Sequence, residues 1–544
     1  MERTSGQGIH GRCRQPGYRR IARCRRSSHQ HPSSIGCPRC DLCRRGVVGD
    51  TPGRQLQADR KTNLPNVAAP LPLRSSWLAG NHRGNPILDS HRHRGGFGSR
   101  VLLWGLSSTR GDSVSRLLVL GAGVSGLAAG RLARREGASV TIYDEKPSSE
   151  ALGEGFAIAN GSWDPVLLNG IDVVVASPGF SERSMPIVEA LEWGIPVWSE
   201  IEYAWRHLQL PVIAVTGTNG KTSVTEATAA MLEASGLNAP ATGNIGAPLS
   251  DFTDDGYDAL VVEVSSFQLR FTETFHPLAA AITNVAADHL DWHGSEYGYR
   301  SSKARIYANQ TSNDLLVYDC DDGGATELAM AASSETYPIS GRRLPSGGGG
   351  VDEGSLVVGD VVIDISELTS QDTSHLANIA SAAALALRVG ATEEAVVKGA
   401  TGYSPGPHRR SLVHEGNGIR WIDDSKATNP HAALSSIRAH DSVILIAGGL
   451  PKGLDLTPIA AEPNVRILIG IGEAGPGLAA SAGERGRLAG TLDNAVEMAA
   501  QAAEDGDTVL LAPGCASFDQ FDSYAARGDR FAELVTQRME DPPR

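Results

Sequence analysis

The stretch Pro211-Val212-Ile213-Ala214-Val215-Thr216-Gly217-Thr218-Asn219-Gly220-Lys221-Thr222 decides the fold of the middle of this chain. Residues 212–215 form a short apolar run, long enough for one buried strand. Gly217 and Gly220 let the backbone bend and come close to a ligand. The residues that follow, 223–232, are typical of a helix. A strand, a glycine loop, Lys-Thr and a helix form the layout of a phosphate-binding loop, in which backbone N–H groups and the helix N-terminus face the anion.

One position departs from the general pattern of such loops. Val215 stands where the first glycine is expected, so an ordinary β–loop–α turn is the alternative interpretation. We favour the phosphate loop because Lys221 and Thr222 follow Gly220 directly. In such loops the lysine reaches the outer phosphates and the threonine hydroxyl holds Mg²⁺.

Composition limits the classes of protein that fit. A chain of 544 residues predicts three or four domains. The formal net charge is -13 although residues 1–100 contain 19 Lys and Arg against 5 Asp and Glu, so the body is strongly acidic and we expect no nucleic-acid partner. No apolar run is long enough for membrane insertion. The body contains two cysteines, Cys320 and Cys515, too few for a disulfide framework, which favours a reducing cytoplasm.

Residues 1–113 differ from the rest of the chain. Arg, His, Ser, Gly and Pro dominate, no helix or strand period persists, and the basic start lacks the apolar segment of a secretory signal. The run Cys37-x-x-Cys40-x-x-Cys43 has no complete partner set for a metal. We expect residues 1–113 to be a disordered or mis-assigned extension, with a true start near Val101 or Val114.

Residues 114–209 predict one small α/β domain. A buried strand over 117–120 leads into Gly121-Ala122-Gly123-Val124-Ser125-Gly126 and a helix, and a second strand over 139–143 ends at Asp144. This is the dinucleotide fingerprint; alone it would indicate NAD, and more generally it predicts a diphosphate at a helix N-terminus. Further strands are expected over 172–176 and 195–198.

Residues 210–404 predict a second α/β domain around the phosphate loop. A strand over 259–262 ends at Glu263, which is placed to bind Mg²⁺ directly or through water. A strand over 280–284 precedes Asp288-His289-Leu290-Asp291-Trp292-His293, and two Asp and two His at one strand end favour chemistry over a structural role. We expect residues 340–355 to be a flexible surface loop and residues 375–387 a helix.

Residues 405–544 predict a third domain with a mostly parallel sheet. Strands are expected over 420–422, 443–447, 465–469 and 508–511. Polar or glycine-rich loops follow three of them. These loops are Asp423 to Asn429, Gly448 to Gly453 and Pro513 to Phe521. Because ligands of open α/β sheets bind beyond the carboxyl ends of strands, we expect the three loops to share one site.

Over about residues 115–540 the chain resembles the Mur ligases, and among them the D-glutamate-adding members. The motifs that carry the resemblance are Thr216 to Thr222, Glu263-Val264-Ser265-Ser266-Phe267-Gln268-Leu269, Asp288-His289-Leu290-Asp291, Asp424-Ser425-Lys426-Ala427-Thr428-Asn429 and Pro513 to Phe521. The resemblance implies three domains: an N-terminal Rossmann-like domain for a uridine nucleotide, a central P-loop ATPase domain with a parallel sheet, and a C-terminal Rossmann-like domain for the amino acid.

The resemblance also implies a reaction. In this family ATP phosphorylates a carboxylate, and an amine then displaces phosphate from the acyl phosphate to form an amide. The implied substrates are UDP-N-acetylmuramoyl-L-alanine, D-glutamate and ATP, in peptidoglycan precursor synthesis, with two Mg²⁺ sites and a carbamylated Lys303. We expect a cytoplasmic monomer.

Site residues are implied position by position. The implied ATP contacts are Gly217, Thr218, Asn219, Gly220, Lys221, Thr222, Asn378, Arg409 and Asp424. The implied metal ligands are Thr222, Glu263, His289 and Lys303, and the implied catalytic residues are Lys221, His289, Lys303 and Asp424. The implied contacts of the UDP-substrate are Val124, Ser125, Asp144, Glu145, Lys146, Ser177, Pro178, Gly179 and Asn244. The implied D-glutamate contacts are Lys426, Thr428, Lys452, Ser517 and Tyr524, where two cationic side chains suit a dicarboxylate.

Three alternatives remain at this stage. Folylpolyglutamate synthase shares the glycine loop and the two-metal site but lacks a domain like residues 114–209. An NAD-dependent oxidoreductase, argued from Gly121 to Gly126, leaves the phosphate loop and Glu263 unexplained. A P-loop ATPase that uses hydrolysis for motion is separated from a ligase by whether phosphate release depends on D-glutamate.

Overall fold

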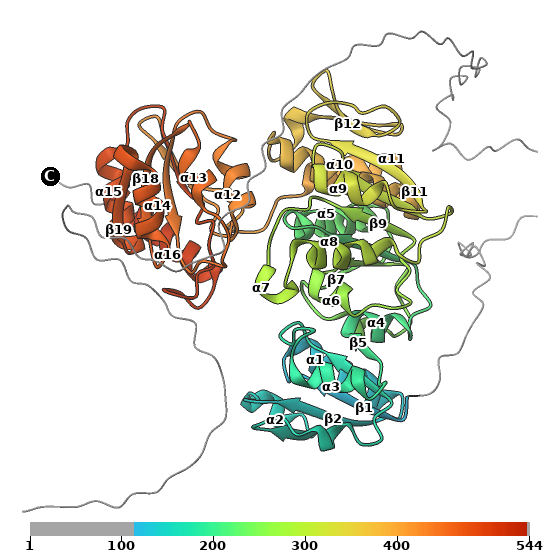
Figure 1. Cartoon of the computed structure of the whole chain (residues 1–544). Helices are drawn as coiled ribbons and strands as arrows, with labels where there is room; N and C mark the ends of the chain where they lie inside the picture. Colours follow the sequence, from blue (N-terminus) through green and yellow to red (C-terminus); the bar gives the residue numbers. More distant parts are fainter. Residues whose placement is uncertain (1–113, 541–544) are drawn as a thin grey trace, which may run out of the picture. The chain divides into compact units, whose positions relative to one another are not determined.

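The computed structural model describes residues 114–540, which form three α/β units, each built on one sheet with helices packed against it (Figure 1). The predictions for residues 1–113, including Cys37 to Cys43, lie outside the described residues. Within residues 114–540, no helix is both long enough and apolar enough to cross a membrane.

The first sheet has five parallel strands in the order β3-β2-β1-β4-β5. Its strands are β1 (Arg116–Leu120), β2 (Ser139–Asp144), β3 (Ala157–Asn160), β4 (Val173–Ala176) and β5 (Val197–Ser199). Its helices are α1 (Val124–Arg135), α2 (Ser149–Gly153), α3 (Met185–Glu192) and α4 (Glu200–Trp205). Leu117 to Leu120 are fully buried, because helices cover both faces of a parallel sheet. The four strands predicted here are confirmed.

The second sheet has nine strands in the order β14-β13-β12-β11-β10-β9-β6-β8-β7. The strands up to β10 are β6 (Val212–Thr216), β7 (Ala241–Gly243), β8 (Leu260–Glu263), β9 (Ala279–Ile282) and β10 (Leu315–Asp319). The helices are α5 (Lys221–Ala234), α6 (Ser266–Arg270), α7 (Leu290–His293), α8 (Glu296–Ala304), α9 (Gly323–Ala329), α10 (Thr373–Val389) and α11 (Glu393–Gly402). Because β6 pairs in parallel with both β8 and β9, the phosphate loop, Glu263 and the segment after Ile282 emerge at one edge.

The prediction of a flexible surface loop over residues 340–355 is wrong for residues 349–352, which form a strand, whereas residues 341–348 form turns and bends without a strand. The remaining strands of this sheet lie there and just beyond: β11 (Glu335–Ser340), β12 (Gly349–Asp352), β13 (Ser355–Val358) and β14 (Val361–Asp364). Gly349 and Gly350 are buried in β12, and a Cβ atom on Gly350 would clash with the carbonyl oxygens of Arg343 and Ser340. The glycines serve close packing here, because they let the backbone of another segment approach.

The third sheet has the order β15-β16-β20-β17-β18-β19. Its strands are β15 (Ser411–Gly416), β16 (Ile419–Asp423), β17 (Val443–Gly448), β18 (Val465–Ile471), β19 (Gly486–Gly490) and β20 (Thr508–Leu511). Its helices are α12 (Pro430–Ile437), α13 (Thr457–Ala461), α14 (Gly475–Ser481), α15 (Leu492–Ala502) and α16 (Tyr524–Glu540). The four predicted strands are the buried inner ones, and sequence reasoning missed the two edge strands, β15 and β19, because neither contains an uninterrupted apolar run.

Candidate active site

The phosphate loop is held in shape by its neighbours. Gly220 adopts a left-handed conformation (φ 82°) at the N-terminus of α5, and a Cβ atom there would lie 2.7 Å from Oδ1 of Asn378. The Thr218 N–H donates to the Asn284 carbonyl at 2.9 Å, and the Thr218 hydroxyl lies 2.9 Å from the hydroxyl of Tyr299. The loop therefore presents the N-terminus of a helix of fourteen residues, which favours an anion.

Two lysines converge on this loop. Nζ of Lys221 donates to the carbonyls of Gly217 (2.9 Å) and Thr218 (3.1 Å), and Nζ of Lys303, from α8, donates to the same Gly217 carbonyl at 2.7 Å. Burial lowers the pKa of Lys221. Burial, and next the positive charge of Lys221, lower the pKa of Lys303 well below its ordinary value. These shifts favour a neutral amine at Lys303.

A buried carboxylate lies at the end of β8. Oε1 of Glu263 accepts a hydrogen bond from the Asn244 amide at 2.8 Å, while Oε2 is buried and has no hydrogen-bond partner. Such an oxygen is costly to bury unless it receives a cation or a donor, so it fits a metal ligand. Thr222 lies half-buried in the first turn of α5. Among residues 114–540 no three His, Cys, Asp or Glu side chains form a ready-made metal site, and Mg²⁺ commonly uses one or two carboxylates together with substrate phosphates.

The segment after β9 carries the predicted Asp-His pair. His289 has a left-handed backbone (φ 52°), its N–H donates to Oδ1 of Asp288 at 2.9 Å, and its ring packs edge-on against Phe267. Burial lowers the pKa of His289, which favours the neutral imidazole that can act as a ligand. The neighbouring His293 is held between serine hydroxyls on α6 and α8, so its role is structural.

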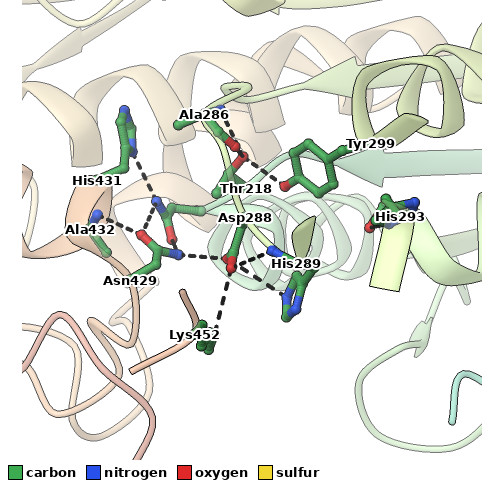
Figure 2. Close-up of polar contacts among 12 residues, drawn as sticks. Thr218, Ala286, Asp288, His289, His293, Tyr299, Asn429, His431, Ala432 and Lys452 are labelled. Atoms are coloured by element: carbon green, nitrogen blue, oxygen red, sulfur yellow. Dashed lines mark hydrogen bonds and ion pairs between the residues drawn. The ribbon is translucent and has the colours of Figure 1, made fainter. Parts of the chain in front are cut away.

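A polar network joins this edge to the third sheet (Figure 2). Asn219 and Asn429 exchange two amide hydrogen bonds, at 3.0 and 3.3 Å, and the Asn219 amide also contacts Nδ1 of His431 at 2.9 Å. Asn429 further donates to Oδ2 of Asp288 at 3.1 Å, and Nζ of Lys452 lies 3.7 Å from Oδ1 of the same carboxylate. Sequence reasoning did not anticipate these pairings, although all but His431 lie in motifs that it singled out.

The three predicted loops of the third sheet do lie together. They follow β16, β17 and β20, which are neighbours in that sheet. Nζ of Lys426 lies 3.9 Å from the centre of the Tyr524 ring, a cation–π distance. Ser517 is buried and Thr428 is half-buried beside Lys426. Lys426 and Lys452 therefore lie in two of these three neighbouring loops.

Two of the predicted ATP contacts, Arg409 and Asp424, do not pair with each other. Asp424 is buried, which raises its pKa. Its cationic neighbour is Arg410, with Nε at 3.9 Å, whereas Arg409 contacts Glu226 at 3.8 Å. Arg410 also pairs with Asp372 at 3.0 Å and has a left-handed backbone (φ 53°). Arg409 and Arg410 are adjacent, and nothing in the sequence indicates which of them faces Asp424.

Most of the residues predicted to contact the uridine nucleotide lie at the carboxyl ends of β1, β2 and β4. Oδ2 of Asp144 accepts the Ala122 N–H at 2.8 Å, and Oδ1 accepts the Lys146 N–H at 2.8 Å. A Cβ atom on Gly126 would clash with the Gly121 carbonyl, whereas one on Gly123 would meet no atom within 4 Å. The remaining residues of the predicted set on this sheet are exposed or half-buried, namely Val124, Ser125, Glu145, Ser177, Pro178 and Gly179. Asn244 is separate from them, because it holds Glu263 in the second sheet.

Comparison with protein-family models gives three matches along the chain. Residues 115–199 match the N-terminal domain of MurD-like Mur ligases, residues 215–341 match the Mur ligase middle domain, and residues 408–515 match the Mur ligase glutamate ligase domain. The three matches follow one another in the order of the three sheets.

Curated relatives and solved structures agree with these matches. A UDP-N-acetylmuramoylalanine–D-glutamate ligase from Frankia casuarinae is 39% identical over 445 residues, which cover 78% of this chain and 94% of the relative. A protein of the same name from Acidobacterium capsulatum is 37% identical over 77% of this chain and 96% of its own length.

Two solved structures share the fold. The first is a pseudomurein peptide ligase type C from Methanothermus fervidus, with a TM-score of 0.50 and 17% identity over 78% of this chain and 99% of its own. The second is the MurF ligase from Thermotoga maritima, solved with ADP, with a TM-score of 0.50 and 18% identity over 80% of this chain and 97% of its own. With three family models in order and relatives matched over nearly their whole length, the chain belongs to the Mur ligase family.

Proposed function

We propose that this protein is an ATP-dependent ligase that joins D-glutamate to UDP-N-acetylmuramoyl-L-alanine, through an acyl phosphate, in peptidoglycan precursor synthesis. The observation that carries the proposal is that the phosphate loop, Asp288 and Lys452 meet in one polar network, with the half-satisfied carboxylate of Glu263 at the same edge of the second sheet. The names of the curated relatives support the choice of substrates. The match of residues 115–199 to a MurD-like domain argues against the folylpolyglutamate synthase alternative.

Each unit has a part in this proposal. Residues 114–209 bind the uridine nucleotide at Val124, Ser125, Asp144 and the neighbouring residues of that set. Residues 210–404 bind ATP, and residues 405–544 bind D-glutamate. The protein acts as a cytoplasmic monomer, and the free thiols of Cys320 and Cys515 suit a reducing compartment.

The first chemical step forms the acyl phosphate. The terminal carboxylate of UDP-N-acetylmuramoyl-L-alanine attacks the γ-phosphorus of ATP, and the bond to ADP breaks. Loop N–H groups and Lys221 stabilise the charge that spreads over the transferred phosphoryl group. Mg²⁺ at these positions would neutralise phosphate charge. Its ligands would be Thr222 and Glu263 at one site and His289 and Lys303 at the other.

Lys303 would act as a Mg²⁺ ligand in the form of a carbamate. A neutral amine adds to CO₂ and releases one proton, which converts a cationic side chain into an anionic oxygen ligand. The lowered pKa of Lys303 supplies the neutral amine, and its position on the Gly217 carbonyl keeps it at the phosphate loop.

The second step forms the amide. The amine of D-glutamate attacks the acyl carbon, and phosphate leaves with one of the original carboxyl oxygens. Lys426 and Lys452 bind the two carboxylates of D-glutamate, and Ser517 and Thr428 orient it. When both carboxylates and the orientation of the molecule are fixed in this way, only one enantiomer directs its amine at the acyl carbon, so L-glutamate should be a poor substrate.

The test measures phosphate release from ATP with UDP-N-acetylmuramoyl-L-alanine, alone and with D-glutamate or L-glutamate. We expect release to require D-glutamate, with L-glutamate far less effective. Equal turnover with both enantiomers would refute the pocket assignment, and release without any amino acid would favour an ATPase.

A further inference from the structure

Arg527 is a buried cation that the proposed reaction does not yet use. It lies on α16, one turn after Tyr524, and is 1% exposed. Within residues 114–540 its guanidinium forms no ion pair, although the nearby carboxylates of Asp519 and Asp423 act to raise its pKa against the larger lowering by burial. Its donors go to neutral oxygens. Nε donates to the Ser425 hydroxyl (3.0 Å), Nη2 to the carbonyls of Ser425 (3.0 Å) and Cys515 (3.2 Å), and Nη1 to that of Ala516 (3.3 Å).

These bonds tie together the loops of the third sheet. Ser425 belongs to the loop after β16, and Cys515 and Ala516 belong to the loop after β20. The loop after β17 joins them: a Cβ atom on Gly449 would lie 3.1 Å from Nη1 of Arg527, and Leu450 exchanges two backbone hydrogen bonds with Ala516 at 2.9 and 3.1 Å. The guanidinium therefore bonds two of the loops and lies close to Gly449 of the third.

The residues that we propose to bind D-glutamate are close in sequence to each of these contacts. Ser425 precedes Lys426, and its hydroxyl donates to the carbonyl of Tyr524 at 2.8 Å, the residue whose ring Lys426 contacts. Ala516 precedes Ser517. The loop that contains Gly449 continues to Lys452. A shift of the Arg527 side chain would therefore move both pocket lysines and Ser517.

Charge gives a second reason to look for a role in binding. A buried guanidinium without an ionic partner costs free energy, and packing alone could be supplied by an apolar side chain. Burial lowers the pKa of Arg527 to about 10, so the side chain stays protonated at neutral pH. Its charge would add to those of Lys426 and Lys452 in attracting a dicarboxylate, and the carboxylates of Asp519 and Asp423 offset part of it.

We propose that Arg527 is the positioning residue of the acceptor pocket: it fixes the three loops that carry the pocket side chains and supplies buried positive charge for an acidic amino acid. This inference rests on the proposed function. Arg527 itself does not contact the reacting atoms.

The test compares Arg527→Lys and Arg527→Met in the full-length enzyme. Lysine keeps the charge but cannot make the four hydrogen bonds that link the loops after β16 and β20, and methionine loses both the charge and these bonds. We expect the KM for D-glutamate to rise roughly tenfold in Arg527→Lys and roughly a hundredfold in Arg527→Met, as for lost hydrogen bonds to a charged group. The KM values for ATP and for UDP-N-acetylmuramoyl-L-alanine should stay unchanged.

A matched control separates positioning from stability. Phe531 lies one turn further on the same buried face of α16 and packs against Trp421 in β16, and it makes no hydrogen bond to the loops through its side chain. Phe531→Leu should lower Tm with no change in the KM for D-glutamate. If the Arg527 variants behave in the same way, with lower Tm and kcat but unchanged KM, the inference is overturned.

If both Arg527 variants fail to fold, a milder variant still tests the positioning role of Arg527. Ser425→Ala removes the acceptor of Nε and the link to Tyr524, and it should raise the KM for D-glutamate severalfold; an unchanged KM would overturn the inference. A wild-type enzyme without D-glutamate-dependent turnover would instead refute the proposed function, so the two failures are distinguishable.

Discussion

The amide pair between Asn219 and Asn429 gives a prediction whose size follows from its geometry. The two side chains exchange hydrogen bonds at 3.0 and 3.3 Å, between the phosphate loop and the loop after β16. A neutral hydrogen bond contributes about 1 kcal/mol net. The pair should therefore show a coupling free energy of about 1–2 kcal/mol, which is roughly 5- to 30-fold in kcat/KM for D-glutamate.

A double-mutant cycle measures this coupling. Asn429 also caps α12 through the Ala432 N–H (2.9 Å) and donates to Asp288, so Asn429→Ala alone costs more than the pair. We would measure kcat/KM for wild type, Asn219→Ala, Asn429→Ala and the double variant at saturating UDP-substrate. The loss of the α12 cap and of the bond to Asp288 occurs in both variants that lack Asn429, so it cancels from the coupling free energy.

The control pairs Asn219→Ala with Asn464→Ala. Asn464 donates to the carbonyls of Ile437 and His440. It lies just before β18, so it is at the opposite end of the third sheet from the three loops. The control pair should be additive within about 0.5 kcal/mol. If Asn219 and Asn429 are equally additive, the two loops do not act together during catalysis.

The remaining predictions concern three other parts of the chain. Lys303→Arg should nearly abolish turnover while ATP still binds, because arginine forms no carbamate; wild type alone should show a carbamate carbon signal with labelled bicarbonate, and a fully active variant would contradict this role. Gly126→Ala should lower Tm, because its Cβ atom would clash with the Gly121 carbonyl, whereas Gly123→Ala should leave Tm unchanged and weaken only UDP-substrate binding; the reverse order in Tm would disprove the assigned geometry. Burial raises the pKa of Glu200 from 4.5 to about 7, so the stability that it contributes is complete below the lower value and is lost as the pH rises through the higher one. Glu200→Gln should therefore reduce the fall in unfolding free energy over that range by up to about 3 kcal/mol, and identical pH profiles for the two proteins would count against it.

Local sequence patterns predicted the inner strands and the phosphate loop. Apolar runs such as residues 212–215 and 443–447 are buried on both faces of a parallel sheet, so the run itself identifies the strand. The three loops of the third sheet were predictable as a group, because parallel strands place their carboxyl ends at one edge.

Features that depend on contacts distant in sequence were not predictable. The glycines near residue 350 resemble a flexible loop until the segment that approaches them is known. Arg527 is one of several arginines in a helical sequence, and only the fold brings two loop segments to its guanidinium. The same holds for Asn219, whose partner Asn429 lies in another sheet's loop.

Transfer of oxygen from substrate to phosphate tests the proposed reaction most directly. UDP-N-acetylmuramoyl-L-alanine labelled with ¹⁸O in its terminal carboxylate is incubated with ATP, D-glutamate and enzyme, and the released phosphate is analysed by mass spectrometry. Formation and breakdown of an acyl phosphate predict one labelled oxygen in each phosphate formed, together with the amide product. Phosphate that carries no label, with its new oxygen taken from water, would contradict the ligase mechanism.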